Sequence, residues 1–520
     1  MFQLSGTVMK RAFLLVGLLL AFLAFLDSSA TNLIGSQVLV NERLTASQLQ
    51  LMQSSYVLTI AATLLPSGLL VKRFGPEMIG LLGSAIFGLS SAGLSLFGDA
   101  FGITALRILQ GLGAALIVPA LLTWLNTSFE GRARRRAFLV WGSMIGSALA
   151  FGPLLASLVS TTYGWRAVFA VNIPVAIAFS LVAFRAKRVA QSKENPRFDV
   201  WGVVFSFVSI GLISLGLELM AENIGRNYVL PVLVLSLGAL FLLVLIWHSS
   251  RRAKNDLPRL LNLSAWKNVR YRTALICAML VTMGEVGILF TVPIYLQNVR
   301  VWDALDVAGV LAIIGLGALA TFALDAWVGT RLKPHTWLVL GLGLEIASGV
   351  WFALIVTADQ ALVAMQVALF VYGLGVGLTA GQIAELVFDN ASEEQSADTS
   401  AMVSVMRQVG AVLGVALIGS LMLISMRVNF AANLESFGTP KVFAGNLADN
   451  ITRTAGANIY DVHEDLIERG MPKPIADDML RQAREDLGNG SRIALNVSSG
   501  LLVISLVSVS LIATKGRRKR

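Results

Sequence analysis

The chain has 520 residues, of which 56% are hydrophobic and only 14% are charged, and its mean hydropathy is +0.73. About a quarter of the residues of a soluble domain are charged, so this composition excludes an ordinary soluble protein and indicates an integral membrane protein. The formal net charge of +10 is spread over loops between apolar runs, so we expect no nucleic-acid partner. Cys277 is the single cysteine, and no Cys/His cluster has the spacing of a metal site, so we expect no disulfide, metal or cofactor.

A membrane-spanning helix needs about 20 apolar residues. The sequence predicts fourteen such spans, near residues 12–40, 47–71, 77–97, 101–127, 137–160, 167–186, 199–219, 227–249, 272–298, 304–330, 335–356, 361–388, 398–426 and 492–514. We therefore divide the chain into six spans in 1–186, a linker with a two-helix hairpin in 187–270, and six spans in 271–520.

The first and last polar segments each leave an alternative open. Residues 1–30 also fit a cleaved signal peptide, but the apolar run continues to Val40, which favours a retained span. The polar loop at 427–491 contains helix-like spacing at 463–469 and 475–487, which predicts two short external helices. A solvated cover is the simpler role for them, and a gate or partner-binding element is the alternative.

Basic residues fix the expected orientation. Alternate loops and both termini hold 27 of the lysines and arginines, whereas the short opposite loops hold only four. Positively charged loops stay in the cytoplasm, so the sequence predicts a multi-pass protein of the cell membrane with both termini cytoplasmic. Anionic lipid is the expected contact of the basic loops.

Small residues mark the fifth span and the turn that follows it. Gly142 and Gly146 are four residues apart, and Gly152 and Pro153 follow on the same span. Small residues let another helix approach closely, and a proline bends a helix whose neighbours satisfy the freed backbone groups. The next turn and span carry Trp165, Arg166, Phe169, Asn172 and Pro174.

This string resembles the antiporter signature of the major facilitator superfamily, in its fourteen-span drug:proton antiporter branch. The resemblance implies an all-α membrane fold of two six-helix bundles with an inserted two-helix hairpin. It also implies conformational roles for the fifth-span residues and for a loop after the second span, Gly68, Lys72, Arg73 and Gly75. Lys72 stands where the family has an acidic residue, so Glu77 or Glu130 is the expected negative partner.

Further matches extend the resemblance over nearly the whole chain. Asp27 and Asn32 resemble the first-span motif, and Arg107 with Gln110 resembles that of the fourth span. Tyr295 and Gln297 close the ninth span as in the branch. The last match lies in the thirteenth span, at Arg407, Gln408, Gly410 and Gly414.

Three acidic residues lie deep in predicted spans, where a charge costs at least about 2.5–3.5 kcal/mol. Asp27 follows Arg11 by 16 residues, or about 24 Å of helix. Glu285 and Glu345 lie about 20 and 15 Å inside their spans on the same count. We expect these carboxyl groups and Arg107 to couple transport to protons. The alternatives are that Asp27 only orients its helix, that the glutamates are salt-bridged or reach the interface, and that Arg107 ties helices together.

The expected function is proton-driven efflux of amphipathic or lipophilic, mainly cationic compounds, including drugs, by a monomeric secondary transporter. The predicted substrate cavity contains Asp27, Asn32, Glu285, Tyr295 and Gln297. Export of a lipid or another endogenous metabolite is the alternative. A membrane-embedded enzyme is disfavoured because the sequence shows no nucleophile–base motif or phosphate loop, and a passive channel because it shows no repeated polar ring.

Overall fold

The structure is a computed structural model, and it is helical throughout the residues that it describes, with no strand among them. The described residues are 6–186, 199–222, 229–255, 257, 260, 265–328, 334–356, 362–392, 395–436, 439–454, 456 and 458–517.

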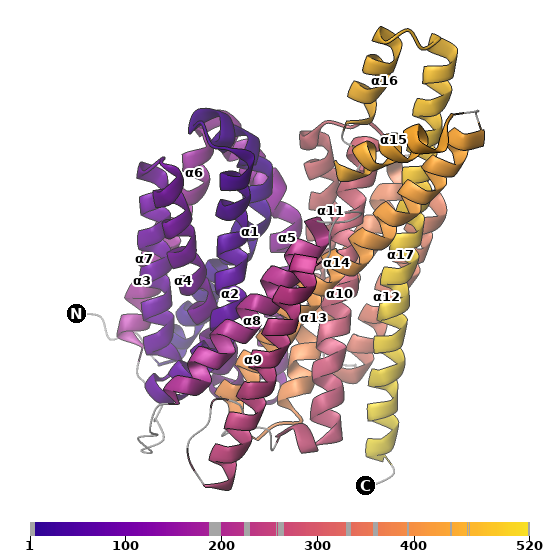
Figure 1. Cartoon of the computed structure of the whole chain (residues 1–520). Helices are drawn as coiled ribbons and strands as arrows, with labels where there is room; N and C mark the ends of the chain where they lie inside the picture. The colour runs from indigo at the N-terminus through magenta and orange to yellow at the C-terminus, as the bar shows by residue number, and fades with distance from the viewer. Residues whose placement is uncertain are drawn as a thin grey trace.

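The first half of the molecule is a bundle of six spans that begins at Gly6 (Figure 1). Its helices are α1 (Gly6–Asn41), α2 (Ala46–Phe74), α3 (Pro76–Leu96), α4 (Ala100–Ser128), α5 (Gly131–Tyr163), α6 (Trp165–Ala170) and α7 (Asn172–Arg185). The pair α6 and α7 forms one span, interrupted at Val171. Local chemistry sets these ends: Thr45 makes a capping box with Gln48, and Asp99 accepts the Gly102 amide.

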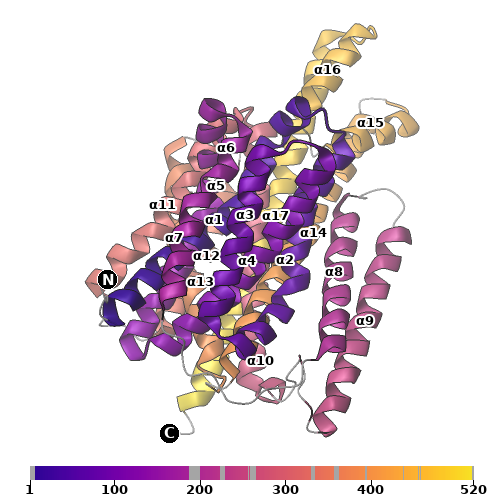
Figure 2. The ribbon, with the colours of Figure 1, turned by 90° about the vertical axis from the view of Figure 1, so that its left-hand side faces the viewer.

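A hairpin and a second six-span bundle follow. The hairpin is α8 (Val200–Glu222) and α9 (Val229–Lys254), and Figure 2 shows it standing at the side of the bundles. The helices of the second half, after the short 3-10 turn Ala265–Lys267, are α10 (Val269–Asn298), α11 (Ala304–Val328), α12 (Pro334–Ile355), α13 (Leu362–Phe388), α14 (Ser396–Ser436), α15 (Lys441–Arg453), α16 (Ile459–Glu468) and α17 (Lys473–Arg517).

The length and hydropathy of the helices confirm the fourteen-span prediction. Among the described residues, thirteen helices are long and apolar enough to cross a membrane, and the bent helix α5 makes fourteen. The two parts of α5, Gly131–Ala148 and Ala150–Tyr163, meet at 51°. Pro153 lies one turn further on, and its ring removes the hydrogen bond to residue 149, so the bend has a local cause.

The polar segment between the last two spans differs from the prediction. Helix α16 matches the expected helix near 463–469, but residues 475–487 are not a separate helix, because α17 continues from Lys473 through the last span. Helix α15 was not predicted from the sequence. We call residues 441–487 the cap; Figure 1 shows it above the second half, with α15 lying across the spans. Its apolar residues, including Ala448, Leu466 and Met479, join the core of that half.

Candidate functional site

Two groups of buried charged side chains lie inside the bundles, one in each half. The first-half cluster comprises Asp27 on α1, Tyr56 on α2, Ser91 on α3, Arg107 and Gln110 on α4, and Asn172 on α7. Each of these residues is at most 1% exposed. A group of charges so deep inside a membrane protein marks a functional site by default.

Both carboxylate oxygens of Asp27 have a hydrogen-bond donor beside them. Arg107 Nη1 donates to Asp27 Oδ2 at 2.8 Å and to Gln110 Oε1 at 2.7 Å. Asn172 Nδ2 lies 3.5 Å from the other carboxylate oxygen, Oδ1. The guanidinium carbon of Arg107 is 4.1 Å from the centroid of the Tyr56 ring, a cation–π contact. The cluster therefore holds one negative and one positive charge in one hydrogen-bonded network, in which Nε of Arg107 is buried without a hydrogen-bond partner.

The second-half cluster has the opposite character. It comprises Glu285 on α10, Glu345 on α12, Tyr372 on α13 and Arg407 on α14. Glu345 is 0% and Glu285 5% exposed. Arg407 Nη2 is 3.7 Å from Glu285 Oε2, a loose ion pair beyond ordinary hydrogen-bond length. Both carboxyl oxygens of Glu345 and Oε1 of Glu285 are buried without a hydrogen-bond partner.

The two halves meet at the end of the molecule that carries the basic loops, which we call the basic end. Lys72 Nζ lies 3.2 Å from Asp398 Oδ2 at the start of α14. The predicted partners of Lys72, Glu77 and Glu130, are therefore replaced by an acidic residue of the other half. Further pairs across the junction are Thr123 with Ser400, Asn126 with Ser396, and Arg134 with Asp389.

Partial burial raises the pKa of Asp389 at this junction, and the guanidinium of Arg134 opposes the shift. Both residues are partly exposed, with side-chain exposures of 44% and 27%. Solvent screens such a pair, so its contribution to holding the halves together is modest.

The predicted small-residue motifs lie where helices approach one another most closely. A side chain at Gly142 would meet the backbone of Gly381 on α13, and one at Gly68 would meet Ala401 on α14, so both glycines lie at the junction of the halves. A Cβ at Gly146 would lie 2.8 Å from Val376. Gly152, beside Pro153 on α5, faces Ser29 and the Leu26 carbonyl of α1.

The predicted loop motif differs in the structure: Gly68, Lys72 and Arg73 lie in the last turns of α2, and only Gly75 forms the tight turn that follows. Gly75 has a φ of 83°, a left-handed conformation that glycine adopts without steric cost. The turn directs Lys72 towards α14, whereas the guanidinium of Arg73 lies 5.2 Å from the Phe74 ring.

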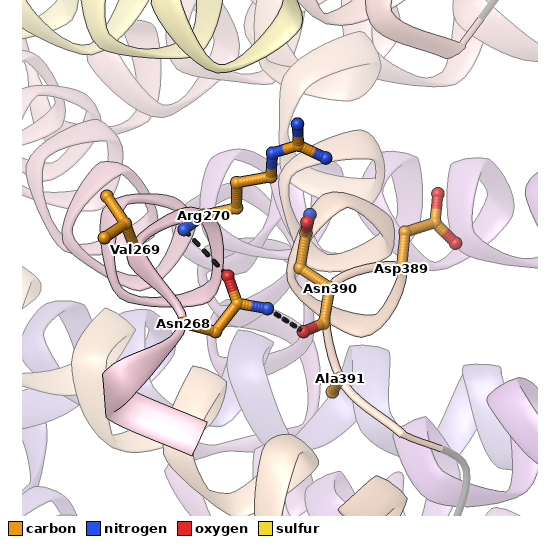
Figure 3. A pocket seen from close by; sticks show the side chains of 6 residues that line it. All are labelled: Asn268, Val269, Arg270, Asp389, Asn390 and Ala391. Carbon is orange, nitrogen blue, oxygen red and sulfur yellow. Dashed lines mark hydrogen bonds between the residues drawn. The ribbon is translucent and has the colours of Figure 1, made fainter. Parts of the chain in front are cut away.

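The remaining predicted cavity residues are not gathered around the two clusters. Tyr295 is fully buried in the core of the second half beside the Phe352 ring, and Gln297 is exposed near the end of α10. The side chain of Asn32 lies outside what the structure describes. A hollow of about 550 Å³ lies at the basic end. Figure 3 shows the residues that line it, Asn268, Val269, Arg270, Asp389, Asn390 and Ala391. None of the predicted cavity residues lines this hollow.

Sequence reasoning named the acidic residues but missed some of their neighbours. Arg407 entered only as part of a motif, although an arginine within a span is itself costly and so marks a site. Tyr372, whose hydroxyl donates to the Glu285 carbonyl at 3.4 Å, had no comparable signal because most aromatics in spans are packing residues. Asp398 was missed because it belongs to the other half of the chain.

The sequence is similar to proteins that are described by their roles in antibiotic resistance. The chain is 25% identical over 411 residues to the methylenomycin A resistance protein of Bacillus subtilis, covering 78% of this chain and 86% of that one. It is 27% identical over 399 residues to the tetracenomycin C resistance and export protein of Streptomyces glaucescens, covering 76% and 73%.

A solved structure and a family model agree on the fold. The human organic anion transporter MFSD10 superposes with a TM-score of 0.60 at 12% identity, and the match covers 98% of this chain and 100% of that one. The family model described as the Major Facilitator Superfamily matches residues 17–415. This chain is therefore a membrane transporter, not an enzyme, and belongs to the Major Facilitator Superfamily.

Proposed function

We propose that this transporter is a proton-driven exporter of amphipathic, mainly cationic compounds, including antibiotics. The observation that carries the proposal is the set of three acidic residues, Asp27, Glu285 and Glu345, buried in otherwise apolar spans. Such groups are retained in a membrane when they bind a proton or a cation. The resistance relatives support a foreign, drug-like substrate.

We further infer that the chain lies in the cell membrane as a monomer with its basic end in the cytoplasm. The excess of lysine and arginine on that end supports the orientation, and anionic lipid headgroups are its natural contacts. A conformation that joins the halves at the cytoplasmic end would give the substrate site access to the outside, as export requires at the release step. Movement of one bundle against the other would then reverse the access.

Transport by purified protein in liposomes tests the function. An outward-directed proton gradient is expected to drive a cationic dye uphill, and collapse of the gradient with a protonophore is expected to stop it. Asp306→Asn, at an exposed position in the first turn of α11, is the matched control and should transport normally. Equal dye movement with and without the gradient would contradict proton coupling. Strong transport of a lipid probe with no transport of any dye would favour the alternative substrate class.

Labelling of single cysteines tests the orientation. With Cys277 replaced by serine, Asn446→Cys on the cap should react with an impermeant thiol reagent added to intact cells. Asn255→Cys, just beyond α9 at the basic end, should react only after the membrane is opened. The reverse pattern would overturn the proposed topology.

A further inference from the structure

The second-half cluster contains two acids and one base. Glu285 reaches the cluster from α10, Glu345 from α12, and Arg407 from α14. Glu285 and Glu345 interact electrostatically with each other, and both interact with Arg407. Full ionisation would therefore leave one uncompensated negative charge on a pair of buried carboxyl groups.

The hydrogen-bond pattern distinguishes the two acids. Glu285 Oε2 has Arg407 Nη2 at 3.7 Å. Both oxygens of Glu345 lack a hydrogen bond of ordinary geometry, although the side chain is 0% exposed and the Thr379 hydroxyl faces it. A buried carboxylate without a hydrogen-bond donor or a counter-ion is unfavourable compared with its neutral acid. Arg407 is therefore the counter-ion of Glu285, and Glu345 is the carboxyl group that must bind a proton to be stable in this site.

Among the described residues, Glu285 and Arg407 are the charged groups that act on Glu345. Helix α13 presents the Tyr372 ring and the Thr379 hydroxyl, which faces the Glu345 carboxyl but makes no hydrogen bond of ordinary geometry with it. It also presents Gly375, where a Cβ would lie 2.5 Å from Glu345 Cγ, so the glutamate fills the space that the glycine leaves. Helix α17, which also packs on α12, contributes the hydroxyl of Ser499 opposite Gly349.

We propose that Glu345 carries the coupling proton, and that Arg407 is a positioning residue that assigns the proton to Glu345 by neutralising Glu285. The proposal rests on the proton-driven export proposed above and identifies the group in this chain that binds the proton. Asp27 differs because Arg107 and Asn172 already occupy its carboxylate. The acid pair therefore holds one proton while the cluster is closed.

Infrared spectroscopy of the purified protein at neutral pH tests this assignment apart from transport. The carboxylic-acid C=O band is expected to lose the contribution of one group in Glu345→Gln. Arg407→Gln should gain one group, because Glu285 loses its counter-ion, and Arg407→Lys should return the band to the level of the parent protein. Glu468→Gln, at an exposed position on α16, should leave the band unchanged. An unchanged band in Glu345→Gln, in a folded and monodisperse sample, would overturn the assignment.

Transport in liposomes separates this inference from the function on which it rests. Glu345→Gln should lose uphill transport driven by the pH gradient and keep downhill substrate exchange. If the parent protein itself shows no dependence on the gradient, the proposed function fails. If the parent protein is driven by the gradient and Glu345→Gln is driven equally well, only the role of Glu345 fails.

Discussion

The first-half and second-half clusters both contain buried charged groups, but they differ in how many hydrogen-bond partners those groups have. Both bury acidic and basic side chains among apolar helices. In the first half, Asp27 has a donor on each carboxylate oxygen, and Arg107 is also held by Gln110 and the Tyr56 ring. In the second half, three carboxyl oxygens of Glu285 and Glu345 have no partner.

This difference teaches which cluster can change its charge easily. A buried ion pair with a donor on each carboxylate oxygen keeps its charges fixed, because removal of either partner leaves the other charge buried and uncompensated. A carboxyl group without partners loses little when it is neutral and can gain a partner only if the helices move. We therefore expect the first-half cluster to be a rigid tie between α1, α4 and α7, and the second-half cluster to respond to protons.

Removal of Arg107 is expected to have the largest effect. Arg107→Ala leaves Asp27 buried beside neutral groups, which should reduce the free energy of unfolding by about 3–5 kcal/mol and abolish transport. The single cysteine, Cys277, is fully buried, so a thiol-reactive dye reports thermal unfolding directly. Arg407→Ala is the matched variant and should cost much less. Equal losses of stability in the two variants would contradict the difference between the clusters.

Replacement of a carboxyl group by its amide compares the stability of the two clusters with a smaller structural change. Asp27→Asn keeps the shape of the side chain but weakens its bond to Arg107, so we expect a loss of about 1.5–3 kcal/mol. Glu345→Gln replaces a group that we infer to be neutral already, and its unfolding free energy should change by less than about 1 kcal/mol. Thermal unfolding of both variants in detergent measures the difference. A larger loss in Glu345→Gln than in Asp27→Asn would reverse our assignment.

Steric change next to the first-half cluster should disturb it without any change of charge. Gly152→Leu would push α5 against Ser29 and Leu26 of α1, close to Asp27, so transport should be lost while membrane insertion is retained. Gly343→Leu on α12 is the matched control, because nothing lies within 4 Å of a Cβ there. Normal transport by Gly152→Leu would show that close packing at this glycine is dispensable.

The smallest effect is expected at the junction that joins the two halves. Lys72→Asp places two acidic groups together and should open the basic end more often, with an energetic effect of about 0–1 kcal/mol for such a partly exposed pair. Asp398→Lys in the same chain should restore the pair with its charges exchanged. Thiol labelling of Asn126→Cys, a partly buried position at the junction, measures the opening. Labelling that the exchange does not reverse would exclude an electrostatic role for the pair.

The sequence was sufficient for the spans but not for the partners. The spans follow from runs of apolar residues, a signal that depends only on local composition. The depth of Asp27, Glu285 and Glu345 could be counted from flanking basic residues. The contacts of Lys72 with Asp398 and of Arg107 with Asp27 join positions 326 and 80 residues apart, and no local pattern specifies such pairs. Helix α15 was missed because its polar sequence is short and lies between the last two apolar runs.

Helix α17 has a mechanical consequence. Its 45 residues run without a break from the cap into the membrane, a length of about 68 Å at 1.5 Å per residue. Arg484, in the outer part of this helix, also donates to the Val299 carbonyl at the end of α10. We therefore expect the cap and the second bundle to move as one rigid body, so that a tilt of that bundle displaces the cap further than it displaces the spans. We expect an antibody fragment bound to α16 to restrain the transport cycle without contacting the substrate path.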